Sequence, residues 1–345
     1  MAIVSRGQPL GLLCGLCLGS LGVVGAGAAA WLALAHCDRR AIAADPEGAA
    51  LTRSQEGQQV TVRSLDGTQL HAQVFGRDDA PTVVLVHGWM CTSAVWRRQI
   101  DELSADFRLV AYDQRGHGQS PPASTGDYSA DTLGADLDAV LDQTVPHGER
   151  VVVAGHSMGA MAVVAWAEAH PDDVAGRIAG AVLVNVGVER LVRQSTLIPL
   201  PASLAALRAA VGERLLAAPL PLPARTNPVL ARLVHAVVLG PDASPAQVTF
   251  STKMLLACPT DVRAAFGATL STFDLAHGLR ELTAPTIVVA GKGDRLTPPV
   301  HARAIAKSLP DATLVELPGV GHMAPIEAHA EITEVIRGLQ TRLSR

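Results

Sequence analysis

Ser157 lies in the stretch "VVVAGHSMGAMAVVAW", where a β-branched run meets a glycine and then a helix-like segment. A serine between a strand and a helix, with a glycine two residues before it and another two after, is typical of a nucleophile on a tight turn. The following helix begins at Met158, so its free N–H groups and its dipole favour negative charge beside the hydroxyl. The pattern predicts that Ser157 attacks a carbonyl group and that an oxyanion forms next to it.

A serine hydroxyl is a weak nucleophile until a base removes its proton. The base expected here is a histidine held by a carboxylate, with the order serine, acid, histidine along the chain. Among the histidines after Ser157, only His322 follows the last predicted strand on a glycine-rich loop, "LPGVGHMAP". Asp294, in "VVAGKGDRLTPP", ends the preceding predicted strand. We therefore expect Asp294 to orient His322 and to stabilise its cation.

The oxyanion needs two preset N–H donors, each typically contributing about 10²–10³ in rate. The residue after the nucleophile, Met158, is expected to supply one. The loop after the run "VLVHG" is expected to supply the other, from Trp89. We expect His87 and Gly88 to shape that loop without acid–base chemistry. The sequence contains no cofactor or metal motif, so none is predicted.

The elements that position these residues are read from the apolar runs. Two short strands, 59–65 and 70–76, flank the turn "DGT" and suit an antiparallel hairpin at a sheet edge. Unbroken β-branched runs then alternate with helical stretches, which predicts a mainly parallel sheet with helices on both faces. The runs are 82–88, 107–113, 150–156, 179–185, 285–291 and 312–319, and the helical stretches are 94–104, 131–141, 158–169, 300–309 and 326–339.

The interval from about 187 to 272 contains no clear strand. It holds two apolar helical stretches, "SLAALRAAVGERLLAA" and "NPVLARLVHAVVL", separated by a proline-rich segment. An insertion of this size after the sixth strand predicts a helical cap over one end of the sheet.

Residues 7–37 contain no Asp, Glu, Lys or Arg. Their apolar core exceeds the roughly 20 residues that cross a bilayer as a helix. The stretch predicts a single-pass membrane anchor within 1–37. A cleaved signal peptide, which would make the protein secreted, is the alternative, although its apolar region is usually only about 7–15 residues long. A polar tether over 38–58 and one domain over 59–345 are expected to follow.

Composition limits the function classes. Of the 345 residues, 48% are apolar and 17% are charged, which argues for a folded chain with a large core. The formal net charge of −4 offers no basic footprint for nucleic acid. The five cysteines are scattered and do not form a disulfide framework or a zinc pattern.

The motifs "VHGW", "YDQRGHGQS", "GHSMG", "GKGDRLTP" and "PGVGH" occur in an order that resembles the α/β-hydrolase superfamily, from about Val60 to the C-terminus apart from the cap. The chain is most similar to the single-domain esterase, lipase and haloperoxidase-like branch. The resemblance implies that Asp113, Arg115 and His117 are structural. Relatives that open epoxides or cleave haloalkanes carry aspartate at the nucleophile position, so Ser157 points to acyl transfer instead.

The sequence thus predicts a serine hydrolase of carboxylic esters, acting through an acyl-enzyme on Ser157. The apolar cap and the anchor favour a hydrophobic acyl or lipid ester at a membrane surface. Two alternatives stay open. The same triad could serve an acyltransferase or a haloperoxidase-like perhydrolase, or the chain could be a non-catalytic, membrane-tethered α/β-hydrolase scaffold.

Overall fold

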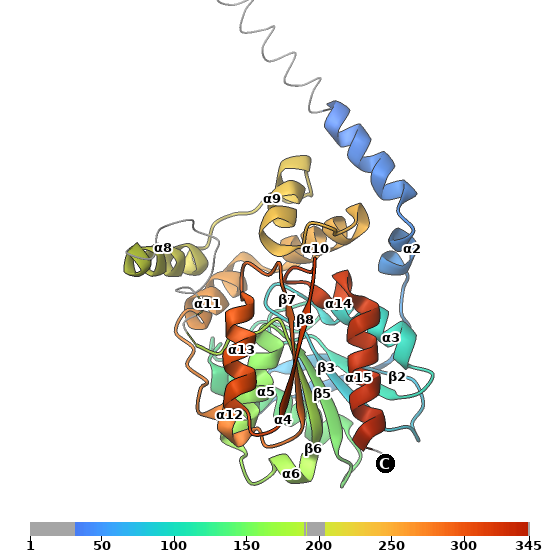
Figure 1. Cartoon of the computed structure of the whole chain (residues 1–345), viewed down its shortest axis with the longest axis vertical. Helices are drawn as coiled ribbons and strands as arrows, with labels where there is room; N and C mark the ends of the chain where they lie inside the picture. Colours follow the sequence, from blue (N-terminus) through green and yellow to red (C-terminus); the bar gives the residue numbers. More distant parts are fainter. Residues whose placement is uncertain (1–31, 190, 192–203, 344–345) are drawn as a thin grey trace, which may run out of the picture.

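A computed structural model, which describes residues 32–189, 191 and 204–343, contains one eight-stranded sheet in the order β1-β2-β4-β3-β5-β6-β7-β8 (Figure 1). The hairpin β1–β2 joins the sheet antiparallel to β4, and the remaining neighbours are parallel. The predicted fold class is confirmed. The strands are β1 (Gln58–Arg63), β2 (Gln69–Phe75), β3 (Thr82–Val86), β4 (Arg108–Tyr112), β5 (Val151–His156), β6 (Ile178–Val184), β7 (Thr286–Gly291) and β8 (Ala312–Leu317).

Helices cover both faces of the sheet, and a separate buried apolar cluster lies under each face. The short 3-10 helix at Ser93–Trp96 and α3 (Arg97–Leu103) pack with α15 (His329–Leu343) on one face. The other face carries α4 (Ala130–Thr144), α5 (Met158–Ala169), α12 (Gly278–Glu281) and α13 (Pro299–Ser308). Two further short helices are α6 (Val174–Arg177) and α14 (Ala324–Glu327). The predicted helix 326–339 is therefore two helices, which meet at Ala328.

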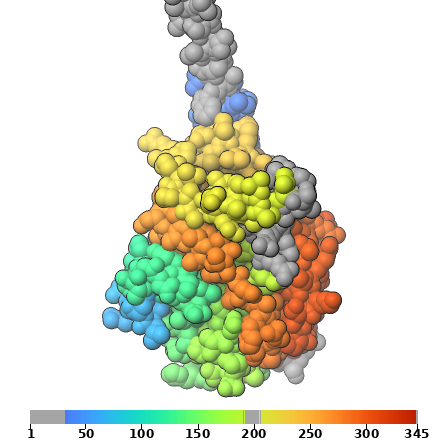
Figure 2. Space-filling view, turned by 90° about the vertical axis from the view of Figure 1, so that its left-hand side faces the viewer, coloured from blue at the N-terminus to red at the C-terminus, as the bar shows by residue number. Residues whose placement is uncertain are grey.

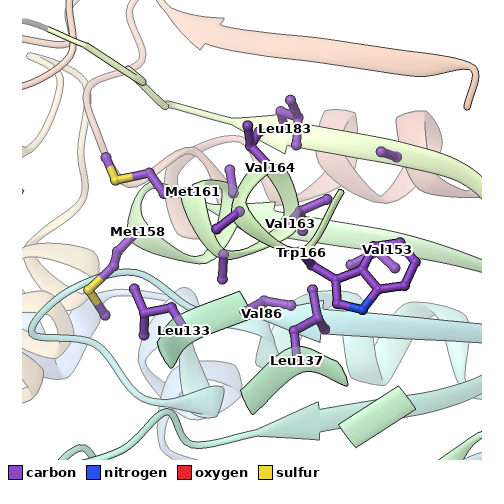
Figure 3. Close-up of a cluster of buried hydrophobic side chains, with 14 of the residues drawn as sticks. Val86, Leu133, Leu137, Val153, Met158, Met161, Val163, Val164, Trp166 and Leu183 are labelled. Carbon is purple, nitrogen blue, oxygen red and sulfur yellow. The ribbon is translucent and has the colours of Figure 1, made fainter. Parts of the chain in front are cut away.

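Helix α5 is apolar around its whole circumference because it is enclosed by the sheet and by α4 (Figure 3). Every residue from 158 to 167 is buried. Gly134 of α4 lets the two helices approach closely, since a Cβ there would lie 3.1 Å from the backbone nitrogen of Trp166. The Trp166 indole N–H donates to Asp138 of α4 at 2.9 Å. The helix that follows Ser157 is therefore held on all sides.

Between β6 and β7 the described chain forms the helices α8 (Ala205–Ala217), α9 (Pro228–Val238), α10 (Pro245–Ala257) and α11 (Thr260–Leu270), called the cap below. They lie at one end of the sheet (Figures 1 and 2). Phe266 of α11 packs against His117 just beyond β4, and the Val238 carbonyl at the end of α9 accepts a bond from the His322 N–H. The cap thus covers the carboxyl ends of the parallel strands.

The N-terminal part of the described chain is docked on the domain. Residues 32–44 are helical, and α2 (Glu47–Thr52) packs on α10 and α3 with Leu51 buried. Asp45 accepts a bond from the Ala246 N–H of α10 at 2.7 Å. The sequence predicts a polar tether over 38–58, whereas these contacts hold most of that segment against the domain.

The predicted anchor within 1–37 falls mostly on residues 1–31, which lie outside the described residues. No helix in the described part of the chain is long and apolar enough to cross a membrane.

Arg115 ties the loop after β4 to the rest of the domain. Its guanidinium is fully buried and bonds Asp136 of α4 at 2.6 and 2.7 Å. It also bonds Asp66, in the β1–β2 turn, at 2.9 Å. The Ser64 hydroxyl donates to the same Asp136 carboxylate. Arg115 and Asp136 are buried and paired, and the partly exposed Asp66 adds a second bond, so the loop that carries His117 is tied to α4 and to the β1–β2 turn.

Replacing Arg115 with methionine should lower the free energy of unfolding by about 3–5 kcal/mol, because it leaves the Asp136 carboxylate buried without its partner. Arg77→Met is the matched control. Its ion pair with Asp79 is about two-thirds exposed on each side, so a loss below about 1 kcal/mol is expected. Urea unfolding followed by tryptophan fluorescence measures both. Equal losses in the two variants would contradict a structural role for the Arg115 pair.

Candidate active site

Ser157 occupies the sharp turn between β5 and α5, with φ 52° and ψ −117°. A positive φ in a non-glycine residue costs about 1–3 kcal/mol and persists only where the surroundings enforce it. The turn is too crowded for larger neighbours. A Cβ on Gly155 would lie 2.5 Å from the Ala160 nitrogen, and one on Gly159 would lie 2.2 Å from the Val86 oxygen. The two glycines that flank Ser157 in the sequence are therefore required by backbone contact.

The structure brings Ser157, His322 and Asp294 into one hydrogen-bonded chain. The Ser157 Oγ lies 3.0 Å from His322 Nε2, and His322 Nδ1 lies 2.8 Å from Asp294 Oδ2. Asp294 follows β7, and His322 follows β8 on the loop from Gly319. The carboxyl ends of three different strands thus contribute to one site.

Asp294 is buried and saturated with donors. Its Oδ1 accepts the backbone N–H groups of Leu296 and Thr297 at 2.9 and 3.0 Å. Its Oδ2 accepts the Thr297 hydroxyl and the Asn185 side-chain amide, each at 2.8 Å, besides His322. Burial alone raises the pKa of Asp294, but the facing His322 and the bonds from Thr297 outweigh it, and the net pKa is lowered. The carboxylate stays charged and can stabilise an imidazolium.

The loop after β3 reaches Ser157. A Cβ on Gly88 would lie 3.0 Å from the Ser157 Cβ, so the backbone just before Trp89 passes close to Ser157. Met158 is the first residue of α5, where an N–H group has no acceptor within the helix. Met158 directly follows Ser157 in the chain and Trp89 directly follows Gly88, so the oxyanion role of both residues stays a prediction that these positions allow.

Two buried histidines hold that loop. His117 Nε2 accepts the Met90 N–H at 3.1 Å, and its Nδ1 bonds the Arg115 carbonyl at 3.1 Å. His87 Nε2 accepts the Gln114 N–H at 2.8 Å. A ring nitrogen that accepts from a backbone N–H is unprotonated, so both imidazoles are neutral. Burial lowers the pKa of each ring, to about 3 for His117.

His156, directly before Ser157, bonds the backbone of His322. Its Nε2–H donates to the His322 carbonyl at 2.8 Å, and the two rings lie 5.2 Å apart. Burial, with a smaller effect from the neighbouring His322, lowers the pKa of His156 to about 3. The ring is therefore neutral and adds no positive charge beside His322. The backbone N–H of His322 donates to the Val238 carbonyl at 2.7 Å, and this bond fixes the loop after β8 to the cap.

The sequence patterns predict no role for Asn185, Thr297 or His156. Asn185 ends the run "AVLVN" at the carboxyl end of β6, next to the strand that carries Asp294. Its φ of 50° is positive, and its amide also donates to the Gly321 carbonyl at 3.1 Å. The position at a strand end is a sequence signal for Asn185. Nothing in the sequence shows which way its side chain turns.

Two other carboxylates that follow Ser157 along the chain, Glu316 and Asp274, make different contacts. Glu316 lies within β8 and pairs with Arg303 on the surface at 2.7 Å. Asp274 accepts the Ala276 N–H in an exposed turn. Neither bonds His322.

A family model described as the alpha/beta hydrolase fold matches residues 81–329. A protein of Variovorax paradoxus, provisionally named carbamate hydrolase RutD, is 30% identical over 80% of this chain and 97% of its own length. The non-heme chloroperoxidase of Streptomyces lividans is 37% identical, over 39% of this chain and 48% of its own. Among solved structures, a thermophilic esterase from Thermogutta terrifontis superimposes with a TM-score of 0.65 at 24% identity, covering 83% of this chain and 99% of that one.

The buried neutral histidines predict a pH dependence of stability. An unfolded histidine has a pKa near 6.5, whereas His156 has a folded pKa of about 3. Between these values the unfolded state binds more protons, so the free energy of unfolding falls as the pH drops. His156→Gln should reduce that slope by up to about 1.4 kcal/mol per pH unit.

Urea titrations across this pH range measure the slope. His147→Gln, at an exposed position, is the control and should leave the slope unchanged. A slope that His156→Gln does not alter would mean that His156 is not held neutral.

Proposed function

The chain belongs to the α/β-hydrolase family, and from this premise we propose that it is a serine hydrolase that cleaves carboxylic esters through an acyl-enzyme on Ser157. The hydrogen-bonded chain from Ser157 through His322 to Asp294 carries the proposal. A hydroxyl, a base and a carboxylate in this order are what acyl transfer requires. The esterase and hydrolase names among the similar proteins support it.

In the proposed reaction, His322 Nε2 removes the Ser157 proton as Oγ attacks the ester carbonyl carbon. Asp294 stabilises the imidazolium that forms. The oxyanion accepts the N–H groups of Met158 and Trp89. His322 then protonates the leaving alcohol, and the acyl-enzyme forms as the carbon–oxygen bond breaks. Water, activated by the same imidazole, releases the carboxylic acid and restores Ser157.

We propose a hydrophobic acyl or lipid ester as the substrate, and a membrane location through an anchor within 1–37. The support is the charge-free run from 7 to 37 and the apolar cap over the site. Secretion after cleavage of a signal peptide is the alternative location.

A second use of the same acyl-enzyme is transfer to hydrogen peroxide, favoured by the partial similarity to a chloroperoxidase. Hydrolysis and this transfer differ only in the acceptor that attacks the acyl group. Product analysis with peroxide present separates them, since a peracid forms only in the second case.

Ser157→Ala should lower the hydrolysis of nitrophenyl esters by at least about 10³-fold, because the acyl-enzyme cannot form. The full chain in detergent is assayed with esters of graded chain length, and we expect longer acyl chains to be preferred. Ser308→Ala, at an exposed position of α13, is the matched control.

If the unaltered protein turns over no ester and Ser157 does not react with a fluorophosphonate, the proposal fails in favour of a non-catalytic scaffold. Reaction with the probe without turnover would retain the triad and reject simple esters as substrates.

A further inference from the structure

Large exposed apolar side chains are concentrated at one end of the molecule. Of the eleven in the described part of the chain, nine fall in residues 32–34 and 204–233. Single apolar residues scattered over a surface are ordinary, but a concentration of this kind marks a contact with a partner or a membrane.

These side chains form stripes along two cap helices. On α8, Leu207, Val211 and Leu215 are four residues apart and therefore share one face. On α9, Val229 and Leu233 do the same, with 64% and 58% of their surfaces exposed. We call these stripes, together with residues 32–34, the apolar face.

The stripes point away from the core because the opposite sides of both helices are used for packing. Helix α8 lies on α11 in backbone contact, since a Cβ on Gly267 would meet the Leu216 carbonyl. Helix α9 packs on α10 and buries Val234. The side chains of the apolar face are therefore not needed for packing within the described domain.

Charge around the apolar face is positive in a chain that is negative overall. Residues 205–238 contain four arginines and one glutamate, whereas the chain carries a formal net charge of −4. Arg214 and Arg225 are exposed beside the stripes, and Arg39 and Arg40 are exposed on the N-terminal helix. Apolar residues rimmed by arginine suit a bilayer with anionic headgroups.

The N-terminal helix reaches the same end (Figures 1 and 2). Asp38 pairs with Arg232 of α9 at 2.9 Å, and residues within 35–42 line a cavity of about 510 Å³ together with α9 and α10. The charge-free run of the sequence, residues 7–37, ends within the N-terminal helix. We propose that the apolar face lies on a lipid bilayer, with its leucines and valines at the acyl boundary and its arginines among the headgroups.

A second copy of the chain is the competing occupant. In a dimer formed through the apolar face, the arginines of the two copies would lie close together. Their like charges would oppose association. Docking on a bilayer does not bring two arginine-rich surfaces together. The proposed anchor within 1–37 would also keep the apolar face close to the bilayer. The proposal rests on the proposed anchor but not on any catalytic activity.

Tryptophan substitution tests the contact in the full chain. The chain carrying Leu233→Trp is reconstituted into vesicles of phosphatidylcholine and phosphatidylglycerol, with and without brominated acyl chains. The added emission should be blue-shifted and largely quenched by the brominated lipid. Leu65→Trp, in the β1–β2 turn and 91% exposed, is the matched control and should be neither shifted nor quenched.

If the added tryptophan at 233 is as unaffected by bromine as the one at 65, the apolar face does not touch lipid and the proposal fails. A blue shift that depends on protein concentration but not on bromine would assign the face to a second copy. If the chain does not float with the vesicles, the anchor fails and the docking proposal fails with it. None of these outcomes requires the protein to hydrolyse an ester.

A separate observation concerns Glu327 of α14. Its carboxylate accepts three backbone N–H groups, from Gly240 at 2.6 Å, from Gly321 at 3.0 Å and from Met323 at 2.9 Å. Gly321 and Met323 flank His322, and Gly240 belongs to the cap. One side chain therefore bonds both sides of the histidine and the turn that follows α9.

The turn and the loop meet backbone to backbone. A Cβ on Gly240 would lie 2.0 Å from the Gly319 carbonyl, and one on Gly321 would lie 2.3 Å from the Gly240 nitrogen. We infer that Glu327 is a positioning residue, which holds His322 at bonding distance from Ser157 by tying its loop to the cap. This inference rests on the proposed function.

Glu327→Ala should slow fluorophosphonate labelling of Ser157 by about 10–100-fold, the effect of displacing a reacting group by a fraction of an ångström to 1 Å. Glu327→Gln keeps one acceptor oxygen and should recover part of the rate. For ester hydrolysis the loss should fall on kcat more than on KM, because substrate binding is not the step disturbed. Glu331→Ala, exposed on α15, is the control.

Thermal unfolding of each variant identifies the folded fraction, and rates are referred to it. If Glu327→Ala labels at the unaltered rate, the positioning role is wrong while the proposed triad stands. If the loss in the alanine and glutamine variants disappears once rates are referred to the folded fraction, Glu327 serves the fold alone and the positioning role is wrong. If the unaltered protein is not labelled at all, the proposed function itself fails.

Discussion

The positive φ of Ser157 is the constraint on which the rest of the site depends. A strand can pass into a helix through one residue only if the flanking positions bring backbone against backbone, which is why Gly155 and Gly159 cannot carry side chains. The strain must be offset elsewhere, and α5 supplies that support because residues 158–167 are all buried between the sheet and α4. The hydroxyl is thereby set at the carboxyl edge of the sheet, where two other strand ends deliver Asp294 and His322.

The buried ionisable groups at this edge of the sheet are each held in one charge state. Asp294 is kept ionised by its donors although it is buried, whereas His87, His117 and His156 are kept neutral by burial. The neutral rings act as hydrogen-bonding supports, each fixed to a backbone group of a neighbouring loop. His322 therefore faces one carboxylate and no competing cation among these neighbours, which suits a group that must gain and lose a proton.

The cap is joined to the site through the backbone. His322 donates to Val238, and Glu327 bonds the turn after α9 together with the residues on either side of the histidine. The same helix α9 pairs with Asp38 at its other side and carries part of the apolar face. The surface proposed to meet a bilayer and the base proposed to activate Ser157 are thus separated by a single helix.

The sequence by itself predicted most of the succession of strands and helices along the chain, and it singled out Ser157, Asp294 and His322, which the fold brings within hydrogen-bonding distance of one another. Local signals suffice for these, because β-branched runs mark buried strands and a glycine-flanked serine permits only one kind of turn. Only the tertiary structure decided the contacts of Asn185, His156 and Glu327, whose partners lie far along the chain. It also placed the segment 38–58 against α10 and directed the apolar stripes of α8 and α9 outward. Such choices depend on which surfaces meet across the fold, and a periodic pattern specifies a face without specifying what that face will touch.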